Sequence, residues 1–134
     1  MKNPLNKKII IGYIGKNGVL AKSFVKKFQK QFIFKVFAGD IRDYKRLNTW
    51  FKKNTDINIF INFAAITSLP VCEKNKKKAI NVNCKSVIKL LCLLNNIHMD
   101  NFNYFLSLST SHVFKKSFFK LKENSTKTPT NYYG

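Results

Sequence analysis

Two glycines three residues apart are the first feature of this sequence suited to chemistry. The segment around them reads Gly15, Lys16, Asn17, Gly18, Val19, Leu20 and Ala21. A glycine at the first position permits a tight turn, a glycine at the second lets the main chain approach a diphosphate, and a small residue at the third lets helix and strand pack closely. Residues 15–20 are therefore predicted to bind a dinucleotide, and a glycine-rich turn without a ligand is the plainer alternative.

An acidic residue after the next apolar run is the second candidate. Asp40 stands three residues after Phe37, which ends the run at 32–37. In dinucleotide-binding α/β folds an acidic residue at the end of the second strand holds the adenosine ribose. Asp40 comes slightly late for that role, so its carboxylate could instead accept the adenine amino group while Ile41 packs on the ring. A solvated turn is the third interpretation, and the choice between phosphorylated and unphosphorylated dinucleotide stays open.

These candidates stand at the boundaries of alternating strand and helix patterns. Short apolar runs predict strands at residues 8–14, 32–37, 57–61 and 104–108. Apolar positions on one face predict helices at residues 19–28, 44–51 and 76–96, with Asp43 as the expected cap of the second helix. This order predicts an α/β fold, a Rossmann-like doubly wound parallel sheet that stops after about four strands.

The composition predicts one globular core with a large positive charge. The chain has 134 residues, is 45% hydrophobic and contains 13 Phe. Lys and Arg number 25 against 6 Asp and Glu, and a formal net charge of +19 is typical of proteins with anionic partners. Only Arg42 and Arg46 are arginines, so the forked side chains that read phosphates and bases are rare. We favour a surplus of lysine on solvated helix faces, and nucleic acid is not the expected partner.

The three cysteines and the apolar segments exclude several further classes of protein. Cys72, Cys84 and Cys92 are odd in number and lack Cys-x-x-Cys spacing, so neither a disulfide framework nor a metal site is predicted. No segment approaches the ~20 apolar residues needed to cross a bilayer, and none resembles a signal sequence. A cytoplasmic location is the simplest expectation.

Several short segments occur in a characteristic order along the chain. They are residues 61–67 (Ile-Asn-Phe-Ala-Ala-Ile-Thr), 72–73 (Cys-Glu), 79–83 (Ala-Ile-Asn-Val-Asn), 107–114 (Ser-Leu-Ser-Thr-Ser-His-Val-Phe), Glu123, Pro129 and 131–134 (Asn-Tyr-Tyr-Gly). This ordered set resembles the extended short-chain dehydrogenase/reductases, and within them it is most similar to the dTDP-4-dehydrorhamnose reductase family. The resemblance extends over essentially all 134 residues.

The resemblance implies a cofactor, a substrate class and a division of the chain. It implies NADPH or NADH as cofactor and a nucleotide-linked 4-keto sugar, in dTDP-rhamnose synthesis, as substrate. Ala64 and Ala65 would lie along the dinucleotide, Thr67 near the nicotinamide, and Asn83 would order the region beneath the active site. Residues 1–110 would form the dinucleotide-binding domain, and residues 111–134 would begin the active-site segment.

The resemblance also assigns catalysis to Thr110 and Tyr133. Hydride transfer to a ketone builds negative charge on its oxygen, which needs a hydrogen-bond donor and then a proton. Thr110 would be the donor and Tyr133 the proton source. A free tyrosine titrates near a pKa of ~10, and the family lowers this pKa with a lysine four residues later, here position 137. The sequence given ends at Gly134, so we expect the N-terminal, cofactor-binding part of such a reductase, inactive as this fragment and without the C-terminal substrate lobe.

Other readings stay open on the sequence. Ser111 and His112 depart from the aspartate and aromatic of the family pattern, and we interpret His112 as a packed or surface residue. An NAD-dependent nucleotide-sugar epimerase or dehydratase fragment is the nearest alternative, followed by a dinucleotide-binding module without catalysis. A basic nucleic-acid binder would use the patch formed by Lys74 and residues 76–78. The oligomeric state is not predicted.

Overall fold

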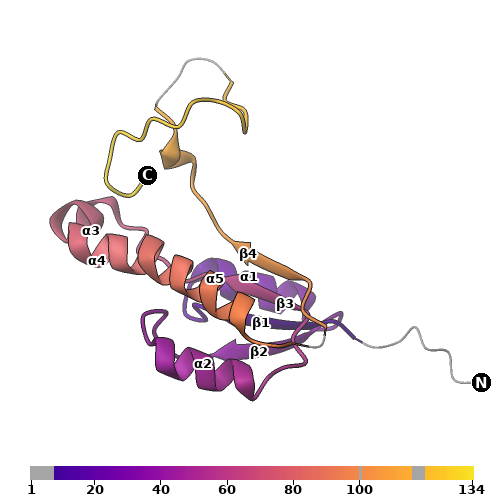
Figure 1. Ribbon diagram of the computed structural model, residues 1–134. Helices are drawn as coiled ribbons and strands as arrows, with labels where there is room; N and C mark the ends of the chain where they lie inside the picture. Colours follow the sequence, from indigo (N-terminus) through magenta and orange to yellow (C-terminus); the bar gives the residue numbers. More distant parts are fainter. Residues whose placement is uncertain (1–7, 100, 116–119) are drawn as a thin grey trace, which may run out of the picture.

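The protein is a parallel sheet flanked by helices, with a C-terminal segment that extends beyond it (Figure 1). This computed structural model describes residues 8–99, 101–115 and 120–134. The strands are β1 (Ile10–Ile14), β2 (Ile33–Phe37), β3 (Ile59–Asn62) and β4 (Tyr104–Ser107). The helices are α1 (Val19–Phe28), α2 (Tyr44–Lys52), α3 (Leu69–Lys74), α4 (Lys76–Ile80) and α5 (Ser86–Asn96), with a π-helical turn η1 (Asn81–Lys85) and a 3-10 turn η2 (Ser111–Val113).

All four strands pair in parallel in the order β2-β1-β3-β4. Ile11 of β1 pairs with Phe34 of β2 on one side and with Ile59 of β3 on the other. After β1 the chain moves to one side of the sheet, and after β2 it crosses to the other side. The strand order therefore reverses between β1 and β3, and the carboxyl ends of strands at such a reversal are where open α/β sheets bind ligands. The predicted Rossmann-like parallel α/β fold is confirmed.

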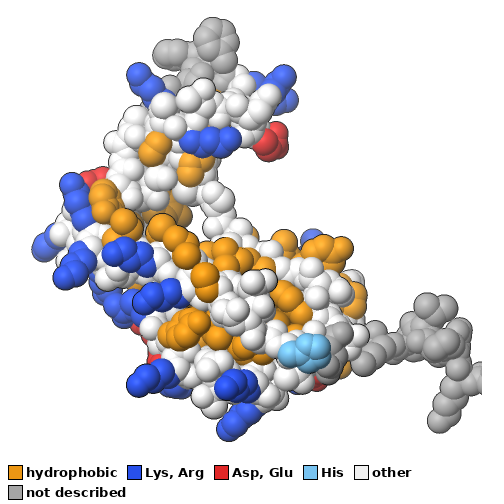
Figure 2. Space-filling view, in the orientation of Figure 1, with side chains coloured by type: hydrophobic (Ala, Val, Ile, Leu, Met, Phe, Trp, Pro, Cys, Tyr) orange, Lys and Arg blue, Asp and Glu red, His pale blue; other side chains and the backbone are white. Residues whose placement is uncertain are grey.

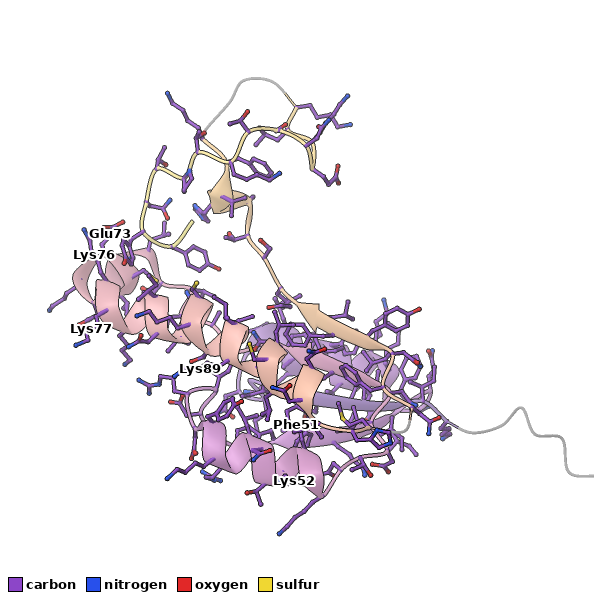
Figure 3. The ribbon with its side chains drawn as sticks, in the orientation of Figure 1. Phe51, Lys52, Glu73, Lys76, Lys77 and Lys89 are labelled. Atoms are coloured by element: carbon purple, nitrogen blue, oxygen red, sulfur yellow. The ribbon has the colours of Figure 1, made fainter. Side chains whose placement is uncertain are left out.

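The main core lies between the sheet and the pair α2 and α5. Ile14, Phe37 and Phe60 of the strands pack with Phe51 of α2 and Leu90 of α5, and none of these side chains is more than 3% exposed. Phe51 lies where α2 faces the sheet (Figure 3). Phe51 and Phe60 meet at 4.8 Å between ring centroids. Burial of these large apolar side chains is the main source of stability for the layer.

Helix α1 covers the opposite face with a cluster of aromatic rings. Phe24 of α1 contacts Phe34 of β2 at 6.0 Å and Phe63, just after β3, at 5.7 Å between centroids. Tyr13 of β1 joins the same cluster through Phe34. Because successive strand residues point to opposite faces, Tyr13 and Ile14 support different layers.

A single long helical run contains a π-helical turn between two α-helical parts. We predicted a helix over residues 76–96, and α4, η1 and α5 cover this range without a break. The N–H of Ser86 bonds the carbonyl of Asn81 five residues earlier, and the Ser86 hydroxyl donates to that same carbonyl at 2.6 Å. Such turns widen a helix locally and often occur at functional sites.

The other predicted elements differ from the structure by at most two residues at each end. Helix α1 has the predicted bounds, and Asp43 caps α2 by accepting the N–H of Arg46 at 3.1 Å. Helix α3 and the turn η2 were not predicted, because six and three residues are too short to show a periodic pattern.

Basic side chains outnumber acidic ones on the face of the molecule that Figure 2 shows. Lys and Arg side chains are spread over this face, and apolar side chains lie between them. Acidic side chains are few on the same face. Within the described ranges, the helices are too short or too polar for a membrane span.

Candidate functional site

The glycine turn lies between β1 and α1, as the sequence predicts. Gly15 has φ of +90°, in the region that side chains other than glycine rarely adopt. A Cβ atom on Gly15 would lie 2.6 Å from the nitrogen of Ala64, so the turn also brings β1 against the exit of β3. The N–H of Gly18 bonds the carbonyl of Gly15 at 3.0 Å and closes the turn.

The turn leaves the first N–H groups of α1 available to an anion. Gly18 caps α1 with extended backbone and has no side chain to occupy those donors. The next residues, Val19 and Leu20, are 80% and 65% exposed. The start of a helix combines free N–H groups with the positive end of the helix dipole, which favours phosphate.

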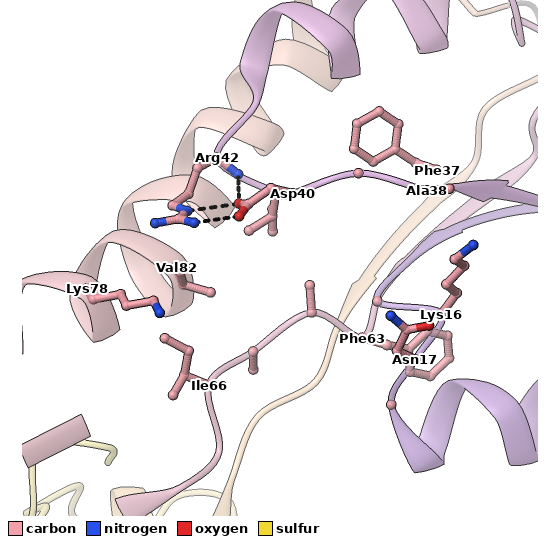
Figure 4. A pocket seen from close by; sticks show the side chains of 16 residues that line it. Lys16, Asn17, Phe37, Ala38, Asp40, Arg42, Phe63, Ile66, Lys78 and Val82 are labelled. Carbon is pink, nitrogen blue, oxygen red and sulfur yellow. Dashed lines mark hydrogen bonds and ion pairs between the residues drawn. The ribbon is translucent and has the colours of Figure 1, made fainter. Parts of the chain in front are cut away.

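A cavity of about 550 Å³ opens beside this turn, at the carboxyl ends of β1, β2 and β3 (Figure 4). Its lining comes from the turn, the loops after β2 and β3, and the α4–η1 helix. The lining residues are Gly15, Lys16, Asn17, Gly18, Phe37, Ala38, Gly39, Asp40, Ile41, Arg42, Phe63, Ala64, Ala65, Ile66, Lys78 and Val82. This volume is within the range of small-molecule sites in proteins.

An ion pair occupies the end of the cavity beyond β2. Both oxygens of Asp40 accept from the Arg42 guanidinium, Oδ1 from Nε at 2.9 Å and Oδ2 from Nη2 at 2.6 Å. Oδ1 also accepts the backbone N–H of Arg42 at 2.8 Å. Hydrogen bonding to the Arg42 side chain lowers the pKa of Asp40 to about 2 and raises the pKa of Arg42. Asp40 is therefore a carboxylate at neutral pH, and its charge is already paired.

Two asparagines shape the wall formed by the loop after β3. Asn62, 4% exposed at the end of β3, accepts the N–H of Ala64 at 3.0 Å and donates to Ser107 Oγ at 3.3 Å. Asn83, in the π-helical turn, accepts the N–H of Ile66 at 2.8 Å and donates to the Ile66 carbonyl at 2.9 Å. These bonds hold the loop against both the sheet and the helix.

The predicted cofactor residues divide between the cavity and its surroundings. The cavity brings together Gly15, Lys16, Asn17, Gly18, Asp40, Ile41, Ala64 and Ala65. Val19, Leu20, Thr67 and Asn83 do not line it. The side chains of Val19 and Leu20 leave α1 toward solvent, Thr67 is exposed, and Asn83 acts on Ile66 from behind the wall.

Eight lining residues were not predicted. They are Phe37, Ala38, Gly39, Arg42, Phe63, Ile66, Lys78 and Val82. Most of them belong to the loops that leave β2 and β3, and the parallel-sheet prediction places such loops at one edge. Lys78 and Val82 are four residues apart on one helix face, but only the packed structure shows that this face meets the loops.

Thr110 and Tyr133, the predicted catalytic pair, both lie in the C-terminal segment, outside the cavity, and each contacts His112. Thr110 Oγ1 accepts the N–H of His112 at 3.2 Å, and the His112 ring meets the Tyr133 ring edge-on at 5.6 Å between centroids. Asn131 Oδ1 accepts the N–H groups of Tyr133 and Gly134 at 3.1 and 3.0 Å. Thr110 and Tyr133 are thus on the same part of the molecule, which the proposed catalytic pairing requires.

Helices α3 and α4 anchor this C-terminal segment. Glu73 Oε1 accepts the backbone N–H of Tyr132 at 2.6 Å. Lys76 Nζ lies 5.4 Å from the centroid of the Tyr132 ring, within the range of a cation–π contact. Figure 3 shows Glu73 and Lys76 next to each other at the end of the helix pair.

Several solved structures are similar to this protein. A hypothetical dTDP-4-dehydrorhamnose reductase from Sulfolobus tokodaii has a TM-score of 0.81 at 24% identity, covering 94% of this chain and 48% of that chain. The dTDP-4-dehydrorhamnose reductase from Bacillus anthracis, solved with NADP, has a TM-score of 0.81 at 20% identity, with 95% and 45% covered. The UDP-glucose 4-epimerase from Thermus thermophilus, solved with NAD, has a TM-score of 0.80 at 13% identity, with 93% and 46% covered.

These structures share the fold, and the chain spans about half of their length. No curated protein sequence matches the chain. The predicted resemblance is confirmed, because dTDP-4-dehydrorhamnose reductases are among the structures with this fold. A sequence model described as GDP-mannose 4,6 dehydratase matches residues 16–134, and this chain therefore belongs to that family.

Proposed function

We propose that this chain binds NADH or NADPH and forms the dinucleotide-binding part of an enzyme that acts on a nucleotide-linked sugar. The observation that carries the proposal is the glycine turn. Gly15 and Gly18 present the start of α1 to a cavity of about 550 Å³ at the reversal of strand order. This arrangement suits a dinucleotide whose diphosphate accepts main-chain N–H groups.

The cavity residues fit the parts of such a ligand. The diphosphate would lie over the turn, since Gly15 and Gly18 have no side chains to block it and the first N–H groups of α1 follow directly. The adenosine half would extend along the exit of β2 toward Asp40 and Ile41. The other half would pass Ala64 and Ala65, whose small side chains allow close approach to the loop after β3.

For the reaction we propose reduction of a nucleotide-linked 4-keto sugar, as the resemblance to dTDP-4-dehydrorhamnose reductases suggests. The bound nicotinamide would supply the hydride. Thr110 would donate a hydrogen bond to the substrate carbonyl and Tyr133 would supply the proton. His112 supports this pairing because it contacts both residues, Thr110 through its backbone N–H and Tyr133 through its ring. We assign this activity to a protein that contains the chain, and dinucleotide binding to the chain itself.

A nucleotide-sugar dehydratase or epimerase is the second candidate, favoured by the family match over residues 16–134. The two candidates differ in redox balance. Reduction of a ketone to an alcohol oxidises one dinucleotide for each sugar. Epimerisation or loss of water leaves the sugar at the same overall oxidation level, so the dinucleotide is regenerated. Loss of dinucleotide absorbance at 340 nm in step with product would favour the reductase.

Dinucleotide binding can be tested on the 134-residue chain by titration with NADH and NADPH, followed by nucleotide fluorescence and calorimetry. We expect saturable binding of at least one dinucleotide. Gly18→Val should weaken it, because a side chain at Gly18 would stand in the cavity over the N–H groups of α1. Ser23→Val is the matched control, since Ser23 is exposed on α1 and does not line the cavity. Absence of binding to either dinucleotide would exclude the proposal.

A further inference from the structure

The lining of the cavity has an excess of positive charge. Lys16, Arg42 and Lys78 line it, whereas Asp40 is the one acidic residue among the lining residues in the described part of the chain. The strand exit between Phe37 and Asp40 holds only Ala38 and Gly39. No carboxylate therefore stands at the position that usually receives a ribose hydroxyl in dinucleotide-binding sheets.

The carboxylate of Asp40 is already hydrogen-bonded to Arg42. Asp40 accepts three hydrogen bonds from Arg42, two from the guanidinium and one from the backbone N–H. A carboxylate has about four acceptor positions, so most of its capacity is used. Recognition of a free ribose 2′-hydroxyl needs an acceptor, and this arrangement offers little of one.

Arg42 retains donors for a second anion. A guanidinium has five N–H groups, and Asp40 takes one from Nε and one from Nη2. The remaining groups are close to solvent, since the Arg42 side chain is 46% exposed. Asp40 therefore orients the Arg42 guanidinium and leaves several of its N–H donors unused. A guanidinium with free N–H donors can bind a phosphate group through two parallel hydrogen bonds.

Lys78 brings a second cation to this end of the cavity from a different element. It lies on α4, and its side chain reaches toward the region of Asp40 and Arg42 (Figure 4). A neighbouring hollow shares Arg42 and Lys78 and adds further cations, namely Lys74, Lys76 and Lys77. The positive region thus begins inside the cavity and continues over its rim.

From these observations, and building on the proposed function, we propose that the cavity selects the dinucleotide that carries a 2′-phosphate on its adenosine ribose, with Arg42 and Lys78 as specificity-determining residues. The phosphate dianion finds two cations and unused guanidinium donors. The 2′-hydroxyl of an unphosphorylated ribose would instead face the Asp40 carboxylate, which already accepts three hydrogen bonds from Arg42. The cation excess favours the ligand with the larger negative charge.

The test is calorimetry of the full chain with NADP⁺ and NAD⁺ at one ionic strength, repeated with 2′,5′-ADP and 5′-AMP as probes of the adenosine half. We expect NADP⁺ to bind about tenfold tighter or more, since two or three charge-assisted hydrogen bonds are gained. Arg42→Ala should reduce this ratio to near one, because it removes a cation and releases Asp40 as an acceptor. Arg46→Ala is the control, since Arg46 does not line the cavity.

Lys78→Ala gives a second test that does not depend on the Asp40 pair. It should lower the ratio several-fold, while Lys26→Ala, at an exposed position of α1 outside both the cavity and the neighbouring hollow, should leave it unchanged. Equal or tighter binding of NAD⁺ to the wild type would overturn this inference and leave the proposed function standing. A preference for NADP⁺ that survives both variants would also overturn it. Absence of binding to both dinucleotides would instead refute the proposed function.

Discussion

The side chain of Asn83 holds the backbone of Ile66 through both of its polar atoms. Its Oδ1 accepts the Ile66 N–H at 2.8 Å, and its Nδ2 donates to the Ile66 carbonyl at 2.9 Å. Asn83 belongs to the π-helical turn, whereas Ile66 lines the cavity from the loop after β3. The pair therefore couples the irregular helix to the wall of the proposed dinucleotide site, although Asn83 does not line that site.

Replacing Asn83 should weaken the fold and the site together. Asn83→Asp keeps the acceptor and loses the donor, and Asn83→Ala loses both. We expect the free energy of unfolding to fall by about 1–3 kcal/mol for the alanine variant, because the Ile66 N–H loses its partner and the Ile66 carbonyl keeps only the weak thiol donor of Cys72. Denaturant unfolding measures this loss, and dinucleotide affinity should fall with it. Asn95→Ala, at an exposed position of α5, is the control, and an equal loss there would contradict this role.

Gly15 and Gly18 should respond differently to alanine. At Gly15 the positive φ and a Cβ 2.6 Å from the Ala64 nitrogen make Gly15→Ala destabilising by about 1–3 kcal/mol or more. At Gly18 the closest atom to an added Cβ is the Gly15 oxygen at 3.4 Å, so Gly18→Ala should leave the thermal midpoint nearly unchanged. Thermal unfolding of both variants is the measurement. Equal midpoints would show that the turn relaxes at no cost.

The Asp40–Arg42 pair should contribute to stability in a defined pH range. The pKa of Asp40 falls from its ordinary 3.8 to about 2 because Arg42 bonds its carboxylate. The folded state therefore binds the proton more weakly than the unfolded state. The contribution is fully present above the unfolded pKa and is lost as pH falls through the folded pKa. Since the pair is half exposed, solvent screening makes the effect small.

The difference in unfolding free energy between wild type and Asp40→Asn should accordingly shrink from about pH 5 to about pH 2. In the Arg42→Ala background the same substitution should show a much smaller trend, because the guanidinium is gone and only the backbone N–H of residue 42 and the charge of Lys78 still favour the Asp40 carboxylate. A trend of equal size in both backgrounds would mean that Arg42 is not the cause.

The three cysteines should differ in reactivity. Burial raises the pKa of the Cys72 thiol, and the Glu73 carboxylate raises it further. Cys72 is fully buried and donates to the Ile66 carbonyl at 3.4 Å, while Cys84 and Cys92 are exposed. Since the thiolate is the reactive form, alkylation at neutral pH followed by mass spectrometry should modify Cys84 and Cys92 first. All three should react alike in denaturant, and early modification of Cys72 would contradict its burial.

Glu73 should hold the C-terminal segment through its bond to the Tyr132 N–H. Glu73→Ala should therefore speed cleavage after Lys127 by a lysine-specific protease several-fold, because local opening becomes easier. Glu73→Gln, which keeps an acceptor, should cleave at an intermediate rate. Glu123→Ala removes an exposed carboxylate whose backbone carbonyl, and not its side chain, bonds Lys127. Similar acceleration in that control would point to lost charge and not to a lost anchor.

Much of the fold was predictable from local patterns. The apolar run before Gly15, the one-sided apolar face of residues 19–28 and the Asp43 cap each depend on neighbours in sequence, and the structure has all three. Alternation of strand and helix then restricts the sheet to parallel pairing, so the loops after the strands share one edge. The glycine turn, Asp40 and the two alanines were therefore predictable as one cavity.

Contacts between distant segments could not be read from the sequence. Arg42 forms an ion pair with Asp40, and Lys78 of α4 lines the cavity. Asn83 of the π-helical turn bonds the backbone of Ile66. These depend on which helix face meets which loop and on the rotation of the helix after its widened turn. The sequence by itself determined the order of the elements and the chemistry at the strand ends. Only the tertiary structure decided which charges are paired and which remain for a ligand, because packing sets the distances between groups far apart in the chain.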